Sequence, residues 1–427
     1  MIQDIKKLLS NTLLKESFIY TFFNLINKVI PFLLLPILIS YVGVKGFGYY
    51  SVFMTLSIIF GHFAGLNIQS VIHRRFFSKS EIDFPVYVFN GFLLIIFSSI
   101  FTFIVTLIFS STIHKIIDVE VQIIVWAVLV AMLNNFIKVL LNIFRVENRP
   151  LAYGLVVSLQ GALVFTISIL LLMHGKFGWE ATVIGQVISG LIFASATLIY
   201  LFKSGYCTIK FHLEDLVDAL KYVVPLLPHG VSGVTFNLSG RLFVSSMDGV
   251  EATGLYTVAF QLASVVSLVC TAFSLAWTNW LFGQLKGGAA NNHKIIKATY
   301  IYFVLVLVFG FVYSLGIPSI ATLILDPDDL GGIYYFKWLV AGFVLQGAYQ
   351  VIVGYLFYDD KTGSISKITV LVALISLALN YFLVSSLSGA GAAISFFISW
   401  LIMFLATFIL VLKNDSSPWK TNRVNSL

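Results

Sequence analysis

Four basic residues fall inside long apolar stretches, where an ionised side chain needs a cavity or a partner. One of them, Lys337, lies close enough to the end of its stretch to snorkel, and we interpret it as structural. Lys28 lies near the middle of the first such stretch, with Asn24 and Asn27 within about one helical turn of it. A charge at the centre of a bilayer costs about 2.5 kcal/mol or more, and such residues usually face a bundle interior or a watery cavity. We therefore predict that Lys28 and the two amides line a cavity.

Lys138 and Arg241 are two further basic residues inside apolar stretches. Arg241 follows Asn237 at i+4 on one helix face, which favours a cavity for both. Lys138 lies about two turns from the end of its stretch, a position compatible with snorkelling as well as with cavity lining. Arg pairs phosphate bidentately and Lys pairs it as a point charge. The pattern predicts a site for an anionic cargo.

Two histidines, His62 and His229, are candidates for coupling transport to protons, because histidine is the side chain whose ordinary pKa lies nearest to neutrality; a neutral, hydrogen-bonded imidazole in each place is the alternative. None of the 19 acidic residues lies in the middle of an apolar stretch, so we expect no carboxylate relay. The sequence Asp326-Pro327-Asp328 favours a turn over a metal site. A Walker A motif is missing from the sequence, so we expect no ATP hydrolysis by that route. We also expect no bound metal, no cofactor and no enzymatic activity.

The composition is that of an integral membrane protein. Of 427 residues, 59% are hydrophobic and only 11% charged, against about 25% charged residues in soluble proteins. Apolar runs long enough to span a bilayer recur twelve times. We place them near residues 17–41, 48–70, 86–110, 120–144, 152–173, 181–202, 221–246, 254–283, 298–325, 333–358, 365–386 and 391–412.

The distribution of Lys and Arg sets the orientation. With a cytoplasmic N-terminus, the loops that face the cytoplasm and the two termini hold most of the 26 basic residues. The loops on the other side hold only Lys45, Lys115 and Lys176. Positive charge gathers on the cytoplasmic side of membrane proteins. We therefore predict that both termini are cytoplasmic.

Two internal matches indicate a duplicated architecture. Gly43-Val44, with Gly48 and Tyr50, recurs 206 residues later as Gly249-Val250, with Gly254 and Tyr256. A second match, from Ile188 to Ile199, recurs at a similar offset from Ile398 to Ile409. Repeats of this kind are common in transporters. We predict an all-α protein of two pseudo-symmetric six-helix bundles, 1–202 and 221–412, joined by a cytoplasmic linker, 203–220, and followed by a cytoplasmic tail, 413–427.

The order of these motifs resembles polysaccharide flippases of the Wzx type, in the MATE-like flippase superfamily. The resemblance rests on the first hairpin, on Pro225-Leu226-Leu227-Pro228, on Arg241 and on the stretch Gly389 to Ala393. It implies a bacterial inner-membrane protein that moves undecaprenyl-diphosphate-linked oligosaccharide, such as an O-antigen unit, by alternating access. Members often carry an acidic residue before the arginine; here that position is Gly240.

The resemblance also bears on partners and on the alternatives. The lipid-linked oligosaccharide is the expected partner, and nucleic acid is not expected. A proton or sodium gradient, a polysaccharide polymerase and a chain-length regulator are further partners that the resemblance leaves open. A cation-coupled multidrug exporter of the same superfamily is one alternative function. A membrane glycosyltransferase or polymerase is another, although the loops predicted outside the membrane are short for such an enzyme.

Overall fold

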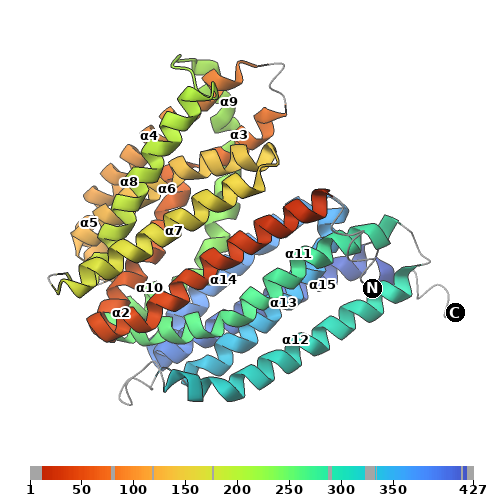
Figure 1. The fold of residues 1–427 in the computed structure, drawn as a ribbon. Helices are drawn as coiled ribbons and strands as arrows, with labels where there is room; N and C mark the ends of the chain where they lie inside the picture. The colour runs from red at the N-terminus through yellow and green to blue at the C-terminus, as the bar shows by residue number, and fades with distance from the viewer. Residues whose placement is uncertain are drawn as a thin grey trace. The chain divides into compact units, whose positions relative to one another are not determined.

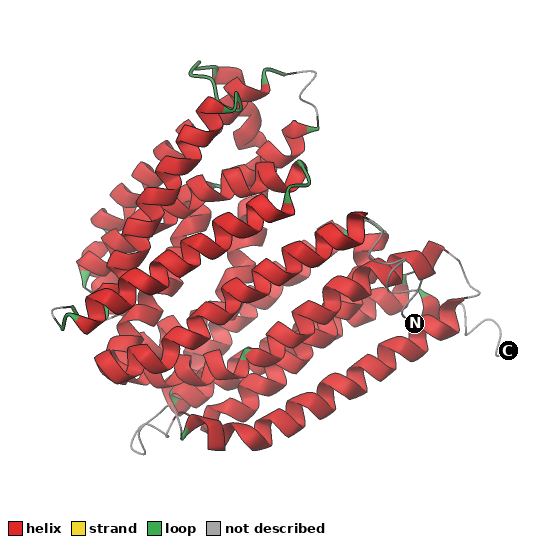
Figure 2. Ribbon diagram, in the orientation of Figure 1, coloured by secondary structure: helices red, strands yellow, loops and turns green. Residues whose placement is uncertain are grey.

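The structure is a computed structural model that describes residues 12–77, 82–117, 120–175, 177–286, 291–322, 332, 334–414 and 417–420. Within these ranges all regular structure is helical (Figure 2). The helices, labelled in Figure 1, are α2 Thr12–Gly65, α3 Ile68–Phe76, α4 Phe84–Ile108, α5 Ser110–Ile117, α6 Val121–Val146, α7 Pro150–Met173, α8 Glu180–Lys203, α9 Leu213–Val223, η1 Val224–Leu226, α10 Leu227–Ala263, α11 Val265–Lys286, α12 Asn292–Ala321, α13 Phe336–Tyr358, α14 Thr362–Leu387 and α15 Gly389–Lys413.

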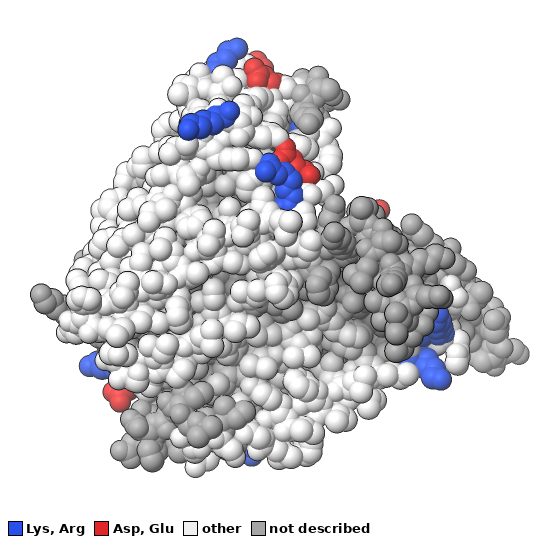
Figure 3. Space-filling model, in the orientation of Figure 1, with Lys and Arg blue, Asp and Glu red and all other residues white. Residues whose placement is uncertain are grey.

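Among the described residues, ten stretches are long and apolar enough to cross a membrane. The sequence predicted twelve, and the difference arises because Val29–Gly65 and Leu213–Leu285 each contain two predicted spans. In the space-filling view, the charged side chains visible on the first part of the chain gather at helix ends, and the surface between them is uncharged (Figure 3). An uncharged belt is what the hydrocarbon layer of a membrane requires.

The two glycines that open the first sequence match share one backbone conformation. Gly43, inside α2, has φ 66° and ψ 176°, and Gly249, inside α10, has φ 86° and ψ 176°. This region is open almost only to glycine. Each residue therefore interrupts what is otherwise a continuous helix, and the match at an offset of 206 residues corresponds to a repeated local structure.

The chain divides into two compact units, residues 1–231 and 232–427. In the first unit, α6 is the central helix, packed against α2, α4 and α8. Its buried face includes Phe136, whose ring centroid lies 5.0 Å from that of Phe92 on α4. Close packing also uses small residues, as is common in membranes. Gly65 of α2 approaches Asn135 so closely that a Cβ there would overlap the amide.

The segment predicted to be a linker contains helix α9, which packs on α3 and α4. Arg75 forms an ion pair with Asp218, and the Tyr87 hydroxyl donates to the same carboxylate at 2.8 Å. In the preceding loop, the backbone N–H of His212 donates to Asn90 Oδ1 at 3.1 Å. Burial in this loop raises the pKa of the Cys207 thiol to about 11. These contacts fasten residues 204–223 to the first unit.

In the second unit, α13 lies among α11, α12 and α15. Trp277 of α11 is buried and donates from Nε1 to the carbonyl of Val351 at 3.2 Å. After α15, Trp419 packs against Tyr300 and donates to its hydroxyl at 3.2 Å. The short segment around Trp419 therefore closes one end of this unit.

Candidate functional site

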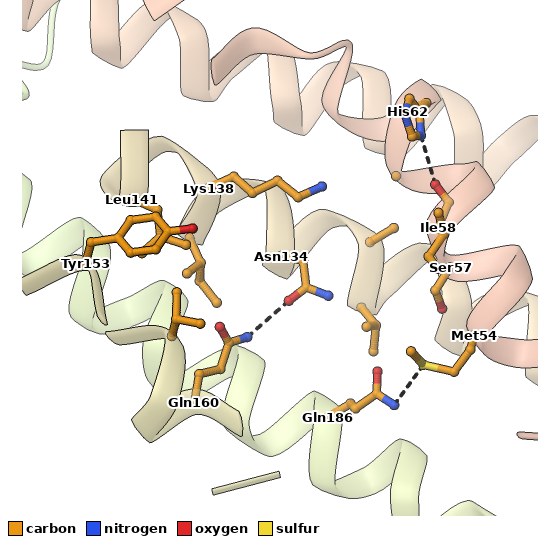
Figure 4. A pocket seen from close by; sticks show the side chains of 15 residues that line it. Met54, Ser57, Ile58, His62, Asn134, Lys138, Leu141, Tyr153, Gln160 and Gln186 are labelled. Carbon is orange, nitrogen blue, oxygen red and sulfur yellow. Dashed lines mark hydrogen bonds between the residues drawn. The ribbon is translucent and has the colours of Figure 1, made fainter. Parts of the chain in front are cut away.

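The first unit contains a cavity of about 340 Å³ between α2, α6, α7 and α8. Its polar lining comes from all four helices (Figure 4): Ser57, His62, Asn134, Lys138, Gln160 and Gln186. Neutral amides, a hydroxyl and one basic side chain thus face a common space. Asp and Glu do not occur among the residues that line it.

Lys138 supplies the positive charge of the cavity. Its side chain is exposed to the cavity, and Nζ donates to Asn135 Oδ1 at 3.3 Å. Asn135 in turn donates to the carbonyl of Gly61 at 2.9 Å, which ties α6 to α2. The ammonium group carries three donors, so donors remain for a ligand when one is used by Asn135.

The amides of the cavity are held in place by one another and by a thioether. Gln160 of α7 donates to Asn134 of α6 at 3.1 Å, and Gln186 of α8 contacts the sulfur of Met54 at 3.2 Å (Figure 4). The Ser57 hydroxyl is buried and finds no hydrogen-bond partner among the described residues. Buried polar groups normally have partners, so an unmatched hydroxyl in a cavity wall indicates a place for a ligand or water.

His62, near the C-terminal end of α2, lines the same cavity. Its Nδ1 lies 3.0 Å from the carbonyl oxygen of Ile58 (Figure 4). A carbonyl only accepts, so Nδ1 carries the proton and Nε2 is the free acceptor of the neutral ring. Together with Lys138, this geometry offers an anion one ammonium group and one imidazole.

With this geometry established, comparison with known proteins assigns the chain to a family. Residues 13–278 match the family described as "Polysaccharide biosynthesis protein". The chain belongs to this family. A protein of the Lsg locus of Haemophilus influenzae is 25% identical over 371 residues, which cover 85% of this chain and 89% of that protein. An uncharacterized membrane protein of the same organism is 24% identical over 380 residues, with coverage of 86% and 89%.

Solved structures show that this polysaccharide biosynthesis protein has a MATE-like transporter fold. An inward-facing multidrug resistance MATE family transporter of the MOP superfamily matches with a TM-score of 0.66 at 16% identity, covering 92% of this chain and 93% of that one. An outward-facing structure of such a transporter matches at 0.60 and 16%, with coverage of 93% and 94%. A MATE transporter of Vibrio cholerae matches at 0.64 and 11%, covering 94% and 98%. At these identities the likeness concerns the fold.

Among the predicted site residues, Lys138 and His62 come together in the cavity. For Lys138, whose position was compatible with two placements, the structure shows cavity lining. Asn24, Asn27 and Lys28 lie on α2, but their side chains are outside the described part of the structure, as is the Asp326–Asp328 segment.

The remaining predicted residues lie on α10. His229 is exposed, and Asn237 donates to the carbonyl of Gly233 at 2.7 Å. The guanidinium of Arg241, in the second unit, stacks over the ring of Phe260 at 4.7 Å. Cation–π contacts of this kind stabilise a buried guanidinium.

Sequence reasoning missed Ser57, Gln160 and Gln186, because it searched the spans for ionisable groups. The neutral residues carry a weaker signal. In α2, Ser57 and Gly61 are four residues apart, on the face that also presents His62. A search for polar and small residues at helical spacing around a histidine would have found this wall.

Proposed function

We propose that this protein is a flippase that moves undecaprenyl-diphosphate-linked oligosaccharide, such as an O-antigen unit, across the bacterial inner membrane. The observation that carries the proposal is the cavity at Lys138, which combines a cation with several amides and lacks carboxylates. Such a lining suits a diphosphate joined to a sugar: Lys compensates the phosphate charge, and amides both donate to and accept from hydroxyl groups.

The family and the fold support the same proposal. The chain belongs to a polysaccharide biosynthesis family and has the fold of transporters solved in inward-facing and outward-facing states. We infer alternating access between those two kinds of state. The proposal includes twelve membrane spans. They are counted by dividing α2 at Gly43 and the 213–285 stretch at Gly249. It also includes a cytoplasmic location for both termini.

The remaining predicted residues keep a place in this proposal. Lys28 and Arg241, with Asn24, Asn27 and Asn237, would add further contacts to the head group of the lipid. A proton or sodium gradient would supply the energy, and His62 is the candidate for proton coupling because it lines the same cavity as Lys138. A polysaccharide polymerase and a chain-length regulator would act on the product.

A multidrug exporter is the second candidate, since the solved structures of this fold include multidrug transporters. Organic cations are usually bound by carboxylates and aromatic faces. The cavity of the first unit instead presents Lys138 and no carboxylate, which favours an anionic cargo.

The proposal is tested in a strain from which the gene is deleted. We expect complete lipid-linked repeat units to accumulate on the cytoplasmic leaflet, and surface polysaccharide to be lost. Units that reach the periplasm but stay unpolymerised would contradict the proposal and would indicate a role after translocation. Unchanged surface polysaccharide with increased sensitivity to drugs would instead support the multidrug exporter.

A further inference from the structure

A second cavity in the first unit is apolar and has a different chemistry from the first. This groove has a volume of about 580 Å³ and lies between α2 and α4, next to the start of α10. Four phenylalanines dominate its walls: Phe60, Phe63, Phe97 and Phe101. Phe101 is 69% exposed and Phe97 57% exposed. Large apolar rings around an open groove fit a hydrocarbon ligand.

The polar atoms in the groove are already occupied. The Ser98 hydroxyl donates to the carbonyl of Ala64 at 2.6 Å, and the Thr102 hydroxyl donates to the carbonyl of Ser98 at 2.7 Å. Both hydroxyls therefore turn to the backbone and offer little to a ligand. The groove presents hydrocarbon, and a head group must be bound elsewhere.

An exposed apolar stripe leads into this groove along α9 and η1. Leu213, Val217, Leu220, Val224 and Leu227 follow one another at intervals of three or four residues, so they share one helix face. The backbone stays helical through Val224 and Leu227, which keeps this face continuous from α9 into α10. Leu213 is 62% exposed and Val224 50% exposed, whereas Leu220 and Leu227 line the groove itself.

The groove and the polar cavity lie on different faces of α2, near its C-terminal end. Gly230 lies against the cavity residue His62, because a Cβ on this glycine would be 3.0 Å from His62 Cδ2. Leu227, three residues earlier on the same helix, lines the groove. On α2, residues 57, 58, 61 and 62 face the cavity while 60 and 63, with Leu66 just after the helix, face the groove. The two sites are separated by no more than the width of one helix, about 10 Å.

We propose that the groove binds the isoprenoid tail of the carrier lipid while the diphosphate head enters the cavity at Lys138. This inference rests on the proposed function, because that function supplies an amphiphile with a polar head and a long, methyl-branched tail. The stripe on α9 would guide the tail into the groove, where Leu66 and Leu227 line the end nearest to the cavity residue His62. The head and tail of one molecule would then occupy two sites of opposite chemistry.

The test uses the purified full chain in detergent micelles and measures binding of undecaprenyl diphosphate. Val105 lines the groove, so Val105→Trp fills it, and Phe101→Ala removes one of its walls. The matched controls are Leu107→Trp and Phe103→Ala, on the same helix at exposed positions outside the groove. We expect Val105→Trp to weaken binding roughly tenfold or more, Phe101→Ala to weaken it severalfold, and both controls to bind like the wild type.

Two further probes identify what the groove recognises. Inorganic diphosphate reports the head-group site alone, and its binding should be unchanged in both groove variants. Dioleoyl phosphatidic acid has a phosphate on straight acyl chains, and its binding should change little. An equal loss for phosphatidic acid would make the groove an ordinary phospholipid site and would overturn the proposal. Undecaprenyl diphosphate bound equally well by wild type, Val105→Trp and Phe101→Ala would overturn it as well.

The failure of this proposal can be distinguished from that of the flippase proposal. If the wild type binds undecaprenyl diphosphate and only cavity variants lose it, the groove assignment alone is wrong. If the wild type does not bind the lipid at all, the flippase proposal fails and the groove assignment fails with it. Thermal unfolding of each variant shows whether the variant is folded. If Val105→Trp is not folded, the independent Phe101→Ala substitution tests the groove assignment.

Discussion

Replacing Lys138 with methionine removes the charge of the cavity while keeping a long, flexible side chain. At an effective dielectric constant of about 20, opposite unit charges 4 Å apart attract by about 4 kcal/mol. Stripping water from the ammonium and the phosphate offsets part of this. The net value of a hydrogen bond to a charged group is about 1.5–3 kcal/mol. We therefore expect Lys138→Met to weaken binding of undecaprenyl diphosphate by roughly 10- to 150-fold.

The structure indicates that this variant stays folded. Lys138 has one described side-chain hydrogen bond, to Asn135 at 3.3 Å. Removing a charge from a membrane span is favourable by about 2.5 kcal/mol or more. The unfolding temperature should therefore be unchanged or higher, and a loss of binding would not reflect misfolding. Lys138→Arg keeps the charge and should retain most of the affinity.

The assay is equilibrium binding of undecaprenyl diphosphate to the purified protein in nanodiscs. Lys337→Met is the control, since this lysine is exposed at the start of α13 and should not affect affinity. Wild-type affinity in a folded Lys138→Met variant would refute the reasoning. An equal loss in Lys337→Met would also refute it, because the effect would then follow net charge and not the cavity.

Two further predictions concern the backbone at Gly43 and the loop that contains Cys207. An added Cβ at Gly43 would meet no atom within 4 Å, so Gly43→Ala should cost only the backbone strain, about 1–3 kcal/mol; thermal unfolding in detergent should show a lower midpoint. Gly363→Ala is the control, because it also has open space but an ordinary helical backbone, and a wild-type midpoint for Gly43→Ala would contradict the assignment. The Cys207 thiol, with its pKa raised to about 11 by burial, should be roughly one part in a thousand thiolate at pH 8. On a Cys270→Ser background, maleimide should therefore label Cys207 slowly at pH 8, and the labelling rate should rise about tenfold for each pH unit up to 11. After denaturation the labelling should be fast. Rapid labelling of the native protein at pH 8 would contradict the prediction, because it would show that the thiol is accessible.

Helices and the local repeat were predictable because both leave strong local signals. The predicted spans 86–110, 120–144 and 152–173 correspond to Phe84–Ile108, Val121–Val146 and Pro150–Met173. Their apolar runs end at polar or proline-containing turns, which the sequence shows directly. Likewise, the match at Gly43 and Gly249 identified a position where the backbone can leave the helix, since only glycine adopts that conformation without strain.

Other features depended on packing and were not visible in the sequence. The predicted eighth span, 254–283, lies within the stretch Leu213–Leu285, and i to i−4 backbone hydrogen bonds continue across Ser264, between α10 and α11. Trp277 of α11 is buried and donates to a backbone carbonyl, a placement that its position in an apolar run does not reveal. Which side of a uniformly apolar helix meets another helix cannot be deduced from periodicity alone.

Part of the candidate site was predictable for a physical reason. A cation in an apolar run is costly enough to identify by itself, so Lys138 was found. Gln160 and Gln186 cost less in a membrane and stand among other neutral residues, so their convergence became visible only when α7 and α8 were placed beside α6.

Reconstitution tests the central claim most directly. The purified protein is placed in liposomes that contain a lipid-linked oligosaccharide on both leaflets, and a membrane-impermeant glycosidase then reports the sugar accessible from outside. With the wild type we predict that nearly all of the lipid becomes accessible as inner-leaflet molecules cross. The Lys138→Met variant should leave the inner half protected, as in protein-free liposomes. Wild-type protein that leaves the inner half protected, with the expected driving gradients imposed, would contradict the account.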